Sequence, residues 1–333
     1  MVGLLIGAVI ALGLLVQMGH VTGFLHVPAE ERSYYESLVG PVVVAPSPGH
    51  DGKTFFLLAN DPWLTEIEAY GDLLGIPRYR AQRILYPMIA GVGGLLSPSW
   101  ILWTLLGVNV MGFGLGSWAT AGIAQAMGRS PWLGLAFAVN PGMYFELAID
   151  GSSIIGWALA LCAIDQIFKA NRLGSVVLLT AATLARETMW LVALGCAAFL
   201  LKRTRWWAVQ IAIAPLTLAG LWAIWVMTRI PDDRFASSLI TVPFEGLVSA
   251  APIWIERGWT YIAVGLLILV SATAVIVGLA KEPNPLTWGT AGFVALLLVL
   301  HRDVLIDYGN ATRVIAPLIT TALIVAVPPR AHP

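Results

Sequence analysis

The most marked shortage in this 333-residue chain is of charge: only 11% of its residues are Asp, Glu, Lys or Arg, whereas 58% are hydrophobic. Soluble domains carry roughly 25% charged residues, so this composition, with a mean hydropathy of +0.80, excludes an ordinary soluble domain. Cys is also scarce. Cys162 and Cys196 lie in apolar segments without CxxC or Cys/His spacing, which argues against a disulfide or a zinc site and favours two buried hydrophobic side chains.

An excess of positive charge is missing as well. The 19 basic residues are balanced by 19 acidic ones, so no basic face is expected for nucleic acid. The motifs HExxH and GxSxG are absent, which removes support for a metalloprotease or a serine hydrolase. Because the N-terminus lacks a Lys/Arg-rich start and a clear cleavage site, we expect its apolar run to be retained as a first helix.

Long apolar segments make up most of the chain. A spanning helix needs about 20 mostly apolar residues, and eight segments approach this length, with two less regular ones at Ile84–Leu96 and Leu173–Leu201. We predict an all-α, multi-pass membrane protein with one domain (1–333) and about ten transmembrane or re-entrant helices. The eight segments are Val2–Phe24, Ile101–Met127, Trp132–Ile149, Ile154–Phe168, Trp206–Met227, Tyr261–Ala280, Trp288–Leu300 and Val314–Val327.

Basic residues gather in short connections, at 129, 169–172, 202–205, 281 and 330, and the positive-inside rule assigns these connections to the cytoplasm. The other connections then face outward from the cell inner (plasma) membrane. One conflict arises. If Ile84–Leu96 and Ile101–Met127 both cross, the first polar loop falls in the cytoplasm; a re-entrant Ile84–Leu96, about 13 residues long and rich in Gly, returns that loop to the outside.

Two polar stretches stand out between the apolar segments. The first, residues 26–82, holds eight of the 19 acidic residues and is expected to line a wet cavity or to be solvated, with Leu64–Leu74 as a short helix on the membrane surface. The second, residues 228–258, is expected to be an outer, interfacial lid because it mixes prolines with aromatic residues. These are Pro231, Pro243, Pro252, Phe235, Phe244 and Trp254.

The first loop contains two acids with ambiguous roles. Asp51 precedes Gly52, so its carboxylate could project from a tight turn beside apolar surface, where desolvation raises the pKa and suits a general base. Asp-Gly is equally a common turn signal. Asp61, before Pro62, could bind a substrate or simply cap a turn or a helix.

Arginines form a second group of candidates. Arg78, Arg80 and Arg83 recur where the chain meets the membrane, and could hold a phosphate through forked hydrogen bonds or snorkel to lipid headgroups. Arg186 and Glu187 separate two apolar runs, each too short to span alone. The pair could lie inside the membrane or at the tip of a hairpin, and could line a functional cavity or neutralise itself.

A third polar cluster, HRDVLIDYGNATR, begins at His301 and includes Arg302. Arg313 could bind an anionic headgroup, and His301 or Tyr308 could bond a substrate hydroxyl. A loop of this polarity could also simply be solvated.

Several motifs taken in chain order resemble the GT-C superfamily of multispanning glycosyltransferases, and most closely its small bacterial members with DGxxFY-like and YRxxRILYP-like motifs. The motifs are HDGKTFFLLANDPWL, YRAQRILYP, VNPGMYFELAIDGSS, LTAATLARETMWLVAL and NATRVIAPL, and they cover most of the chain. The resemblance implies transfer of a sugar from a polyprenyl-phosphate carrier to a lipid or glycan acceptor at the outer face of the membrane.

The resemblance also implies roles for individual residues. Asp51 would be the base that deprotonates the acceptor hydroxyl, and Asp61 would bind sugar hydroxyls. Arg83, Arg186 and Arg313 would stabilise the departing lipid phosphate, with Glu187 orienting Arg186. The chain lacks the tight Asp-x-Asp of the metal-dependent members after its first apolar segment, so neither a metal nor another cofactor is expected.

Two other classes of protein remain open. A transporter or flippase of a lipid-linked or anionic substrate also fits an arginine-rich cavity beside lipid, but would be expected to have pseudo-symmetric halves, whereas the large polar loop here lies only near the N-terminus. A non-catalytic subunit of a membrane complex predicts that Asp51 and Arg186 do not share a cavity.

Overall fold

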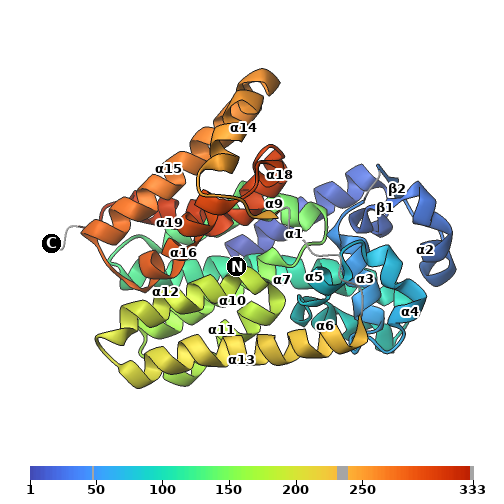
Figure 1. The fold of residues 1–333 in the computed structure, drawn as a ribbon, viewed down its shortest axis with the longest axis horizontal. Helices are drawn as coiled ribbons and strands as arrows, with labels where there is room; N and C mark the ends of the chain where they lie inside the picture. The colour runs from blue at the N-terminus through green and yellow to red at the C-terminus, as the bar shows by residue number, and fades with distance from the viewer. Residues whose placement is uncertain (47–48, 231–238, 331–333) are drawn as a thin grey trace.

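The computed structural model describes residues 1–46, 49–230 and 239–330 as an assembly of helices (Figure 1). The only strands in these ranges are β1 (Val27–Pro28) and β2 (Val44–Ala45), which pair in parallel with Val27 opposite Val44. The predicted all-α class is therefore confirmed.

The helices follow one another with short 3₁₀ helices (η) between the longer α-helices. Up to the end of the first loop they are α1 (Val2–Met18), η1 (Val21–Leu25), η2 (Ala29–Glu31), α2 (Arg32–Val39), α3 (Asp51–Asn60), α4 (Ile67–Tyr70), η3 (Gly71–Leu74), α5 (Pro77–Ala81), α6 (Leu85–Gly91) and η4 (Val92–Leu95). The later ones are α7 (Pro98–Ala126), η5 (Pro131–Gly134), α8 (Leu135–Ala138), α9 (Pro141–Ala148), α10 (Ser153–Phe168), α11 (Arg172–Ala185), η6 (Glu187–Met189), α12 (Trp190–Leu201), α13 (Arg205–Arg229), α14 (Glu245–Arg257), α15 (Trp259–Lys281), α16 (Pro285–Val299), α17 (Arg302–Leu305), α18 (Tyr308–Val314) and α19 (Ala316–Val325).

Three helices, α7, α13 and α15, are long and apolar enough to cross a membrane. At 1.5 Å per residue their 29, 25 and 23 residues extend over roughly 35–43 Å, more than the hydrocarbon core of about 30 Å. α13 leaves much of its apolar surface uncovered, with Leu221 and Ile224 57% and 60% exposed. Long helices with uncovered apolar surface indicate a membrane protein.

Ten full-length crossings are not seen. The other apolar helices within the described ranges have only 10–17 residues, and two predicted spans are broken. Trp132–Ile149 divides into η5, α8 and α9, because Pro141 has no N–H to continue the helical bonds and starts a new helix capped by Asn140. Leu173–Leu201 divides into α11 and α12, because Arg186 is extended, with φ −149° and ψ 116°.

The two halves of the second broken segment run in opposite directions. Trp207, near the start of α13, donates its indole N–H to the hydroxyl of Ser175 near the start of α11 (3.0 Å). Since α12 leads into the start of α13, the start of α11 and the end of α12 lie close together. Arg186 and Glu187 are therefore at the tip of a helical hairpin, the second of the two positions that the sequence allowed.

Connections rich in Lys and Arg collect at one end of the bundle, on the left of Figure 1 together with the C-terminus. Arg129, after α7, donates to the Glu282 carboxylate between α15 and α16 (2.7 Å) and to the carbonyl of Val327 after α19 (2.6 Å). Arg203 and Pro283 line one groove at this end. The basic residues that the topology prediction used thus lie on one side of the molecule.

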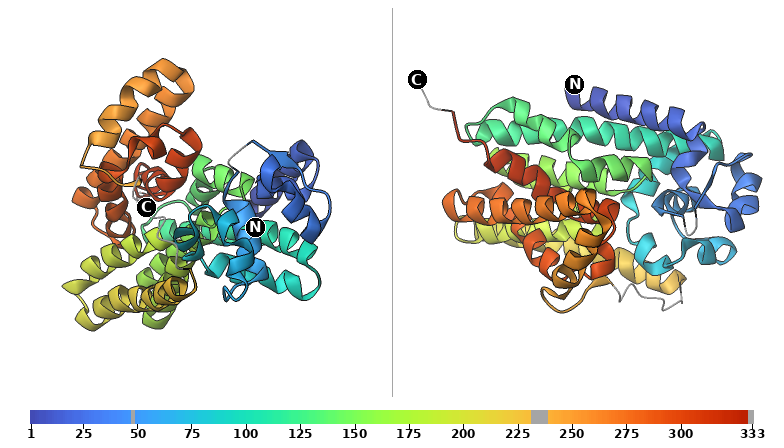
Figure 2. Two further views of the ribbon diagram at one scale, coloured as in Figure 1. Left: turned by 45° about the vertical axis from the view of Figure 1, so that its right-hand side comes forward. Right: turned by 90° about the horizontal axis from the view of Figure 1, so that it is seen from above.

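The first loop packs at the opposite end of the bundle, as the blue segments in the right-hand view of Figure 2 show. α6 and η4 lie beside the first turns of α7: Thr104 donates to the carbonyl of Ala90 (2.6 Å), and the Tyr86 hydroxyl to that of Leu105 (3.0 Å). This segment is too short to cross the bundle. A segment of this length is what the re-entrant alternative for Ile84–Leu96 requires.

Both polar stretches differ in detail from prediction. The single surface helix expected over Leu64–Leu74 is instead α4 followed by η3, because Tyr70, at the end of α4, departs from helical geometry with φ −136°. Leu64 lies before α4 and has a left-handed φ of 57°. In the second stretch, α14 is a helix that includes Pro252. Pro231 and Phe235 of the predicted lid lie outside the described residues.

Candidate active site

A cavity of about 520 Å³ lies where the first loop meets the ends of the later helices. Its lining comes from distant stretches of chain: residues 49–51, 76–83, 186–188, 239–240, 296–304 and 310–314. Charged and aliphatic side chains share the lining. The charged ones are Asp51, Arg80, Arg83, Arg186, Glu187, Asp303 and Arg313, and the aliphatic ones are Ile76, Leu239, Ile240, Leu296, Leu300, Val304 and Val314.

Asp51 is the first residue of α3 and not part of a tight turn, which corrects the prediction from the Asp-Gly pair. Gly52 is needed for close packing: a Cβ there would lie 2.3 Å from the carbonyl oxygen of Phe24 and 2.9 Å from that of Ile149. The first turn of α3 is therefore held tightly against neighbouring backbone. This contact fixes the direction in which the Asp51 carboxylate leaves the helix.

Three guanidinium groups surround the Asp51 carboxylate. Arg313 Nη2 donates to Oδ2 at 2.8 Å, Arg80 Nε lies 3.6 Å from Oδ1, and Arg83 Nη1 lies 3.7 Å from Oδ2. Burial alone would raise the pKa of Asp51, but these arginines and Arg186 outweigh it and hold the pKa well below its usual range. The direction is the reverse of the raised pKa that the sequence suggested.

Glu146 does not line the cavity but binds Arg313, which does, and sequence reasoning missed this acid. Its Oε1 accepts from Arg313 Nε (2.6 Å) and from the Ser153 hydroxyl (2.6 Å), while Oε2 accepts from the Ser153 N–H at the start of α10 (3.1 Å). The side chain has no exposure to solvent. A single acid in the apolar segment Trp132–Ile149 was the available signal, because a carboxylate at such a position needs a partner.

Arg83 and Glu187 form a forked ion pair. Arg83 Nε and Nη2 donate to the two carboxylate oxygens of Glu187 at 2.7 and 2.8 Å, and the guanidinium also lies 4.3 Å from the ring centre of Tyr79. Against the effect of burial, Arg83 and Arg186 lower the pKa of Glu187 to about 2. The sequence predicted that Glu187 orients Arg186, whereas the hydrogen bonds go to Arg83.

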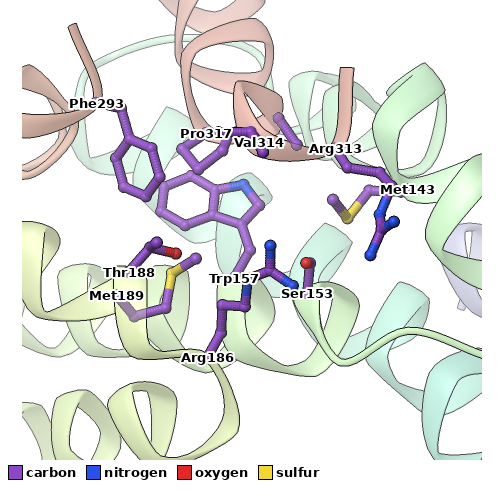
Figure 3. Close-up of a pocket in the computed structure, with 11 residues that line it drawn as sticks. Met143, Ser153, Trp157, Arg186, Thr188, Met189, Phe293, Arg313, Val314 and Pro317 are labelled. Atoms are coloured by element: carbon purple, nitrogen blue, oxygen red, sulfur yellow. The ribbon is translucent and has the colours of Figure 1, made fainter. Parts of the chain in front are cut away.

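Arg186 is the least satisfied of the four arginines. It is 7% exposed, and its Nη1 has no hydrogen-bond partner among the described residues; the nearest carboxylate oxygen, Glu146 Oε1, is 4.0 Å away. Figure 3 shows the guanidinium groups of Arg186 and Arg313 on either side of Ser153. A buried cation with an unused donor, beside a cavity, is suited to bind an anion.

Several predicted site residues do not line this cavity. Asp61 accepts hydrogen bonds from the Thr65 and Glu66 N–H groups and the Thr65 and Tyr70 hydroxyls, at 2.7–2.9 Å. Its carboxylate is therefore committed to closing a turn, the structural alternative that the sequence allowed. Arg78 donates to the carbonyl of Ile230 (2.8 Å).

The candidate residues of the third polar cluster, HRDVLIDYGNATR, lie in different surroundings. His301 caps α17 by accepting from the Asp303 N–H, and the exposed Arg302 lies 3.6 Å from the Asp303 carboxylate. Tyr308 lines a smaller neighbouring pocket together with Arg313. Of this cluster's candidates, only Arg313 is part of the main cavity lining.

A second buried acid, Asp150, lies between α9 and α10, and sequence reasoning did not single it out. Its Oδ1 accepts from the Tyr86 hydroxyl (3.0 Å) and from Asn109 Nδ2 (3.1 Å). In the part of the chain that the structure describes, these neutral groups are its only hydrogen-bond donors. Burial therefore raises the pKa of Asp150 to about 7, although both hydrogen bonds oppose the rise.

Replacing Asp150 with Asn is expected to stabilise the protein above pH 7. A carboxyl whose pKa is higher in the folded than in the unfolded state favours folding in its protonated form, so this stability is lost as pH rises from about 4 to 7. With a pKa about 3 higher in the folded state, at about 1.4 kcal/mol for each pKa unit, ionisation of Asp150 costs about 4 kcal/mol. Thermal unfolding in detergent should show a higher Tm for the variant at pH 8, and a much smaller gain at pH 5. An equal gain at both values would contradict the assignment.

Comparison with protein-family models, with curated proteins and with solved structures found no match to this chain. Across residues 1–46, 49–230 and 239–330, no three His, Cys, Asp or Glu side chains come together as a metal-ligand group. The functional argument therefore depends on the geometry of the cavity.

Proposed function

We propose that this protein is a membrane glycosyltransferase that moves a sugar from a polyprenyl-phosphate carrier to a hydroxyl of a lipid or glycan acceptor, with inversion at the anomeric carbon. One observation carries the proposal: Asp51, from the first loop, shares a cavity with Arg80, Arg83, Arg186 and Arg313, which come from three other stretches of the chain. An acid that can take a proton thus lies beside cations that can stabilise a departing phosphate. The shared cavity is unexpected for a non-catalytic subunit.

The charges of the cavity suggest an order of events. Arg83 is neutralised by Glu187, and Arg313 by Glu146 and Asp51, whereas Arg186 retains an unused donor. The donor phosphate binds Arg186 first and then competes with Asp51 for Arg313. As Arg313 turns toward the phosphate, the pKa of Asp51 rises and the carboxylate becomes a better base than it is in the resting site.

The reaction follows from this arrangement. Asp51 removes the proton of the acceptor hydroxyl as its oxygen attacks the anomeric carbon, and the bond from that carbon to the phosphate oxygen breaks. The polyprenyl phosphate leaves with one more negative charge than it carried in the donor. Because Arg83, Arg186 and Arg313 face this developing charge, they stabilise the transition state more than the ground state.

The aliphatic lining suits the lipid part of the donor. Leu239, Leu300 and Val304 line the cavity with Ile240, which is 62% exposed. α14 lies close in sequence and exposes further aliphatic residues, including Val248 at 70%. A polyprenyl chain that entered from the membrane between these groups would keep its apolar surface away from water.

The proposal includes a position in the membrane. About ten helices, three of full length and the others shorter or re-entrant, make the protein multi-pass in the cell inner (plasma) membrane. The end that carries Arg129, Arg203 and Arg330 faces the cytoplasm by the positive-inside rule, and the cavity at the opposite end faces outward. Water-soluble acceptors and lipid-linked donors can both reach that side.

The direct test is to incubate purified protein with a series of polyprenyl-phosphate sugars and measure release of polyprenyl phosphate. A transferase releases it with transfer of the sugar to an acceptor, and the new glycosidic bond has the opposite anomeric configuration. A flippase moves the lipid between leaflets of a vesicle without cleaving it. Movement without cleavage would therefore replace the proposal with the transporter alternative.

Replacing Arg186 with Gln is expected to lower kcat/KM for the lipid-linked donor by about 10²–10³-fold, the range for loss of one preorganised donor to a developing oxyanion. The change should leave folding intact, because Nη1 of Arg186 has no partner to lose among the described residues. The matched control is Arg172→Gln, an exposed arginine near the start of α11. Equal donor kinetics in the two variants would exclude Arg186 from phosphate binding.

A further inference from the structure

A second, smaller pocket adjoins the main cavity across Arg313. Its volume is about 200 Å³, and it lies between the start of α3, the helix α9 and the start of α18. The side chains that matter for recognition are His50, Phe145, Asp307, Tyr308, Asn310 and Arg313. His50, Asn310 and Arg313 also line the main cavity, so the two spaces share one wall.

The position of this pocket relates it to Asp51. His50 immediately precedes Asp51, and Arg313 donates to the Asp51 carboxylate at 2.8 Å while lining both spaces. A group bound in the smaller pocket therefore lies next to Asp51, the proposed base. Arg313 separates this group from the main cavity. The mouth is open to water, because Asp307 and Tyr308 are exposed.

The lining combines aromatic rings with polar groups, and its one arginine, Arg313, is already bonded to Glu146 and Asp51. The rings of Phe145 and Tyr308 meet at 72° with their centres 5.0 Å apart, so one presents an edge to the other's face. Asp307 supplies a carboxylate, Asn310 an amide and His50 an imidazole. Partial burial, with His26 and Arg313 nearby, lowers the pKa of His50, so this imidazole is neutral at pH 7 and can both donate and accept.

These features favour one class of ligand. A phosphate would be repelled by Asp307 and would prefer the four arginines of the main cavity. Asp307 Oδ1 accepts from the Asn310 N–H (2.7 Å) and Asn310 Oδ1 accepts from Arg313 Nη1 (3.0 Å). An apolar ligand would therefore offer nothing to the other Asp307 carboxylate oxygen or to the Asn310 NH₂ group, and would take water away from them. A volume of about 200 Å³ is below the roughly 300–1,000 Å³ of pockets for drug-sized ligands, so a single small ring fits. A neutral ring with several hydroxyl groups fits the charge, the hydrogen-bonding groups and the size of the pocket.

We infer that the smaller pocket is the acceptor site, and that it binds one monosaccharide ring of a glycan acceptor between Tyr308, Asp307 and Asn310. The C–H face of the sugar lies against the aromatic rings, and its hydroxyl groups bond to Asp307, Asn310 and His50. One hydroxyl then points past Arg313 toward Asp51. This assignment depends on the proposed transferase function for its role as acceptor site, but sugar binding by the pocket is independent of catalysis.

The test is saturation-transfer NMR of the purified protein with the methyl pyranosides of glucose, galactose, mannose and N-acetylglucosamine and with methyl arabinofuranoside. At least one is expected to bind saturably. Tyr308→Ala should weaken its binding about tenfold, as loss of an aromatic contact worth up to about 1.5 kcal/mol predicts, and Asp307→Asn should weaken it several-fold. The control Tyr144→Ala removes a ring that contacts Phe145 but does not line the pocket, and should have no effect.

The outcomes separate the two proposals. If no glycoside binds, or if Tyr308→Ala and Asp307→Asn bind as tightly as the unaltered protein, the pocket is not a sugar site. If a glycoside binds at Tyr308 but no polyprenyl-phosphate sugar is ever cleaved, the sugar site stands and the transferase function falls. If transfer occurs and Tyr308→Ala leaves KM for the acceptor unchanged, the acceptor binds elsewhere and this inference is wrong.

Discussion

Replacing Asp51 with Asn is expected to lower kcat for sugar transfer by about 10²–10⁴-fold, the usual contribution of a positioned general base. Asn keeps the shape of the side chain and an oxygen that can accept from Arg313, but it cannot take a proton at neutral pH. Binding of the lipid-linked donor should be retained or tightened, because the arginines lose a competing carboxylate. The measurement is kcat and KM for the donor in purified protein of unchanged elution profile and Tm.

The matched control is Glu68→Gln, which removes an exposed acid from the same loop and should leave transfer unchanged. The pH profile adds an independent check. Because Arg313, Arg83 and Arg80 hold the pKa of Asp51 below its usual range, this carboxylate is ionised at every pH above about 4. No acid limb from Asp51 is therefore expected in kcat/KM between pH 5 and 8. Full turnover by the Asn variant would remove Asp51 from the mechanism.

Replacing Glu146 with Gln is expected to lower the free energy of unfolding by about 3 kcal/mol. Breaking a buried ion pair by removing one partner typically costs about 3–5 kcal/mol, and the lower end applies because Arg313 keeps its contact with Asp51. The Gln amide also turns an N–H group toward donors on Ser153 or Arg313. Thermal or denaturant unfolding in detergent measures the change.

A double-mutant cycle distinguishes loss of this pair from a general loss of packing. Combining Glu146→Gln with Arg313→Gln should cost less than the sum of the two single changes, because the second substitution removes the unpaired cation that the first one leaves. The control Glu36→Gln breaks an exposed pair with Arg32 and should not change Tm measurably. Strict additivity of Glu146→Gln and Arg313→Gln would show that the two side chains do not interact.

The long apolar runs made the three full-length helices, α7, α13 and α15, predictable. Pro215 lies inside α13 without ending that helix. The shorter helices were harder, since their ends depend on single residues. Pro141 breaks one predicted span because it lacks an N–H, a signal that the sequence did carry. Arg186 breaks the predicted span Leu173–Leu201. The only signal for this break in the sequence was a charged pair between two apolar runs.

The sequence predicted which charged residues form the candidate site, but not which of them form ion pairs with one another. Asp51, Arg83, Arg186 and Arg313 stood out because ionisable residues in so apolar a chain need a wet cavity or a partner. Which groups pair depends on the folded chain: Glu187 follows Arg186 directly, yet it bonds to Arg83, 104 residues earlier. Glu146 was missed because a lone acid in an apolar stretch gives no indication of which cation will reach it.

The bond between Asp51 and Arg313 joins groups 262 residues apart in the sequence. During synthesis, Asp51 leaves the ribosome long before Arg313, the arginine that donates a hydrogen bond to it. Until α18 arrives, Arg80 and Arg83, which are made soon after Asp51, can balance the charge of that carboxylate. Because residues 310–314 line the main cavity, its lining is completed only late in the synthesis of this protein, and a translation product truncated before α18 lacks that part of it.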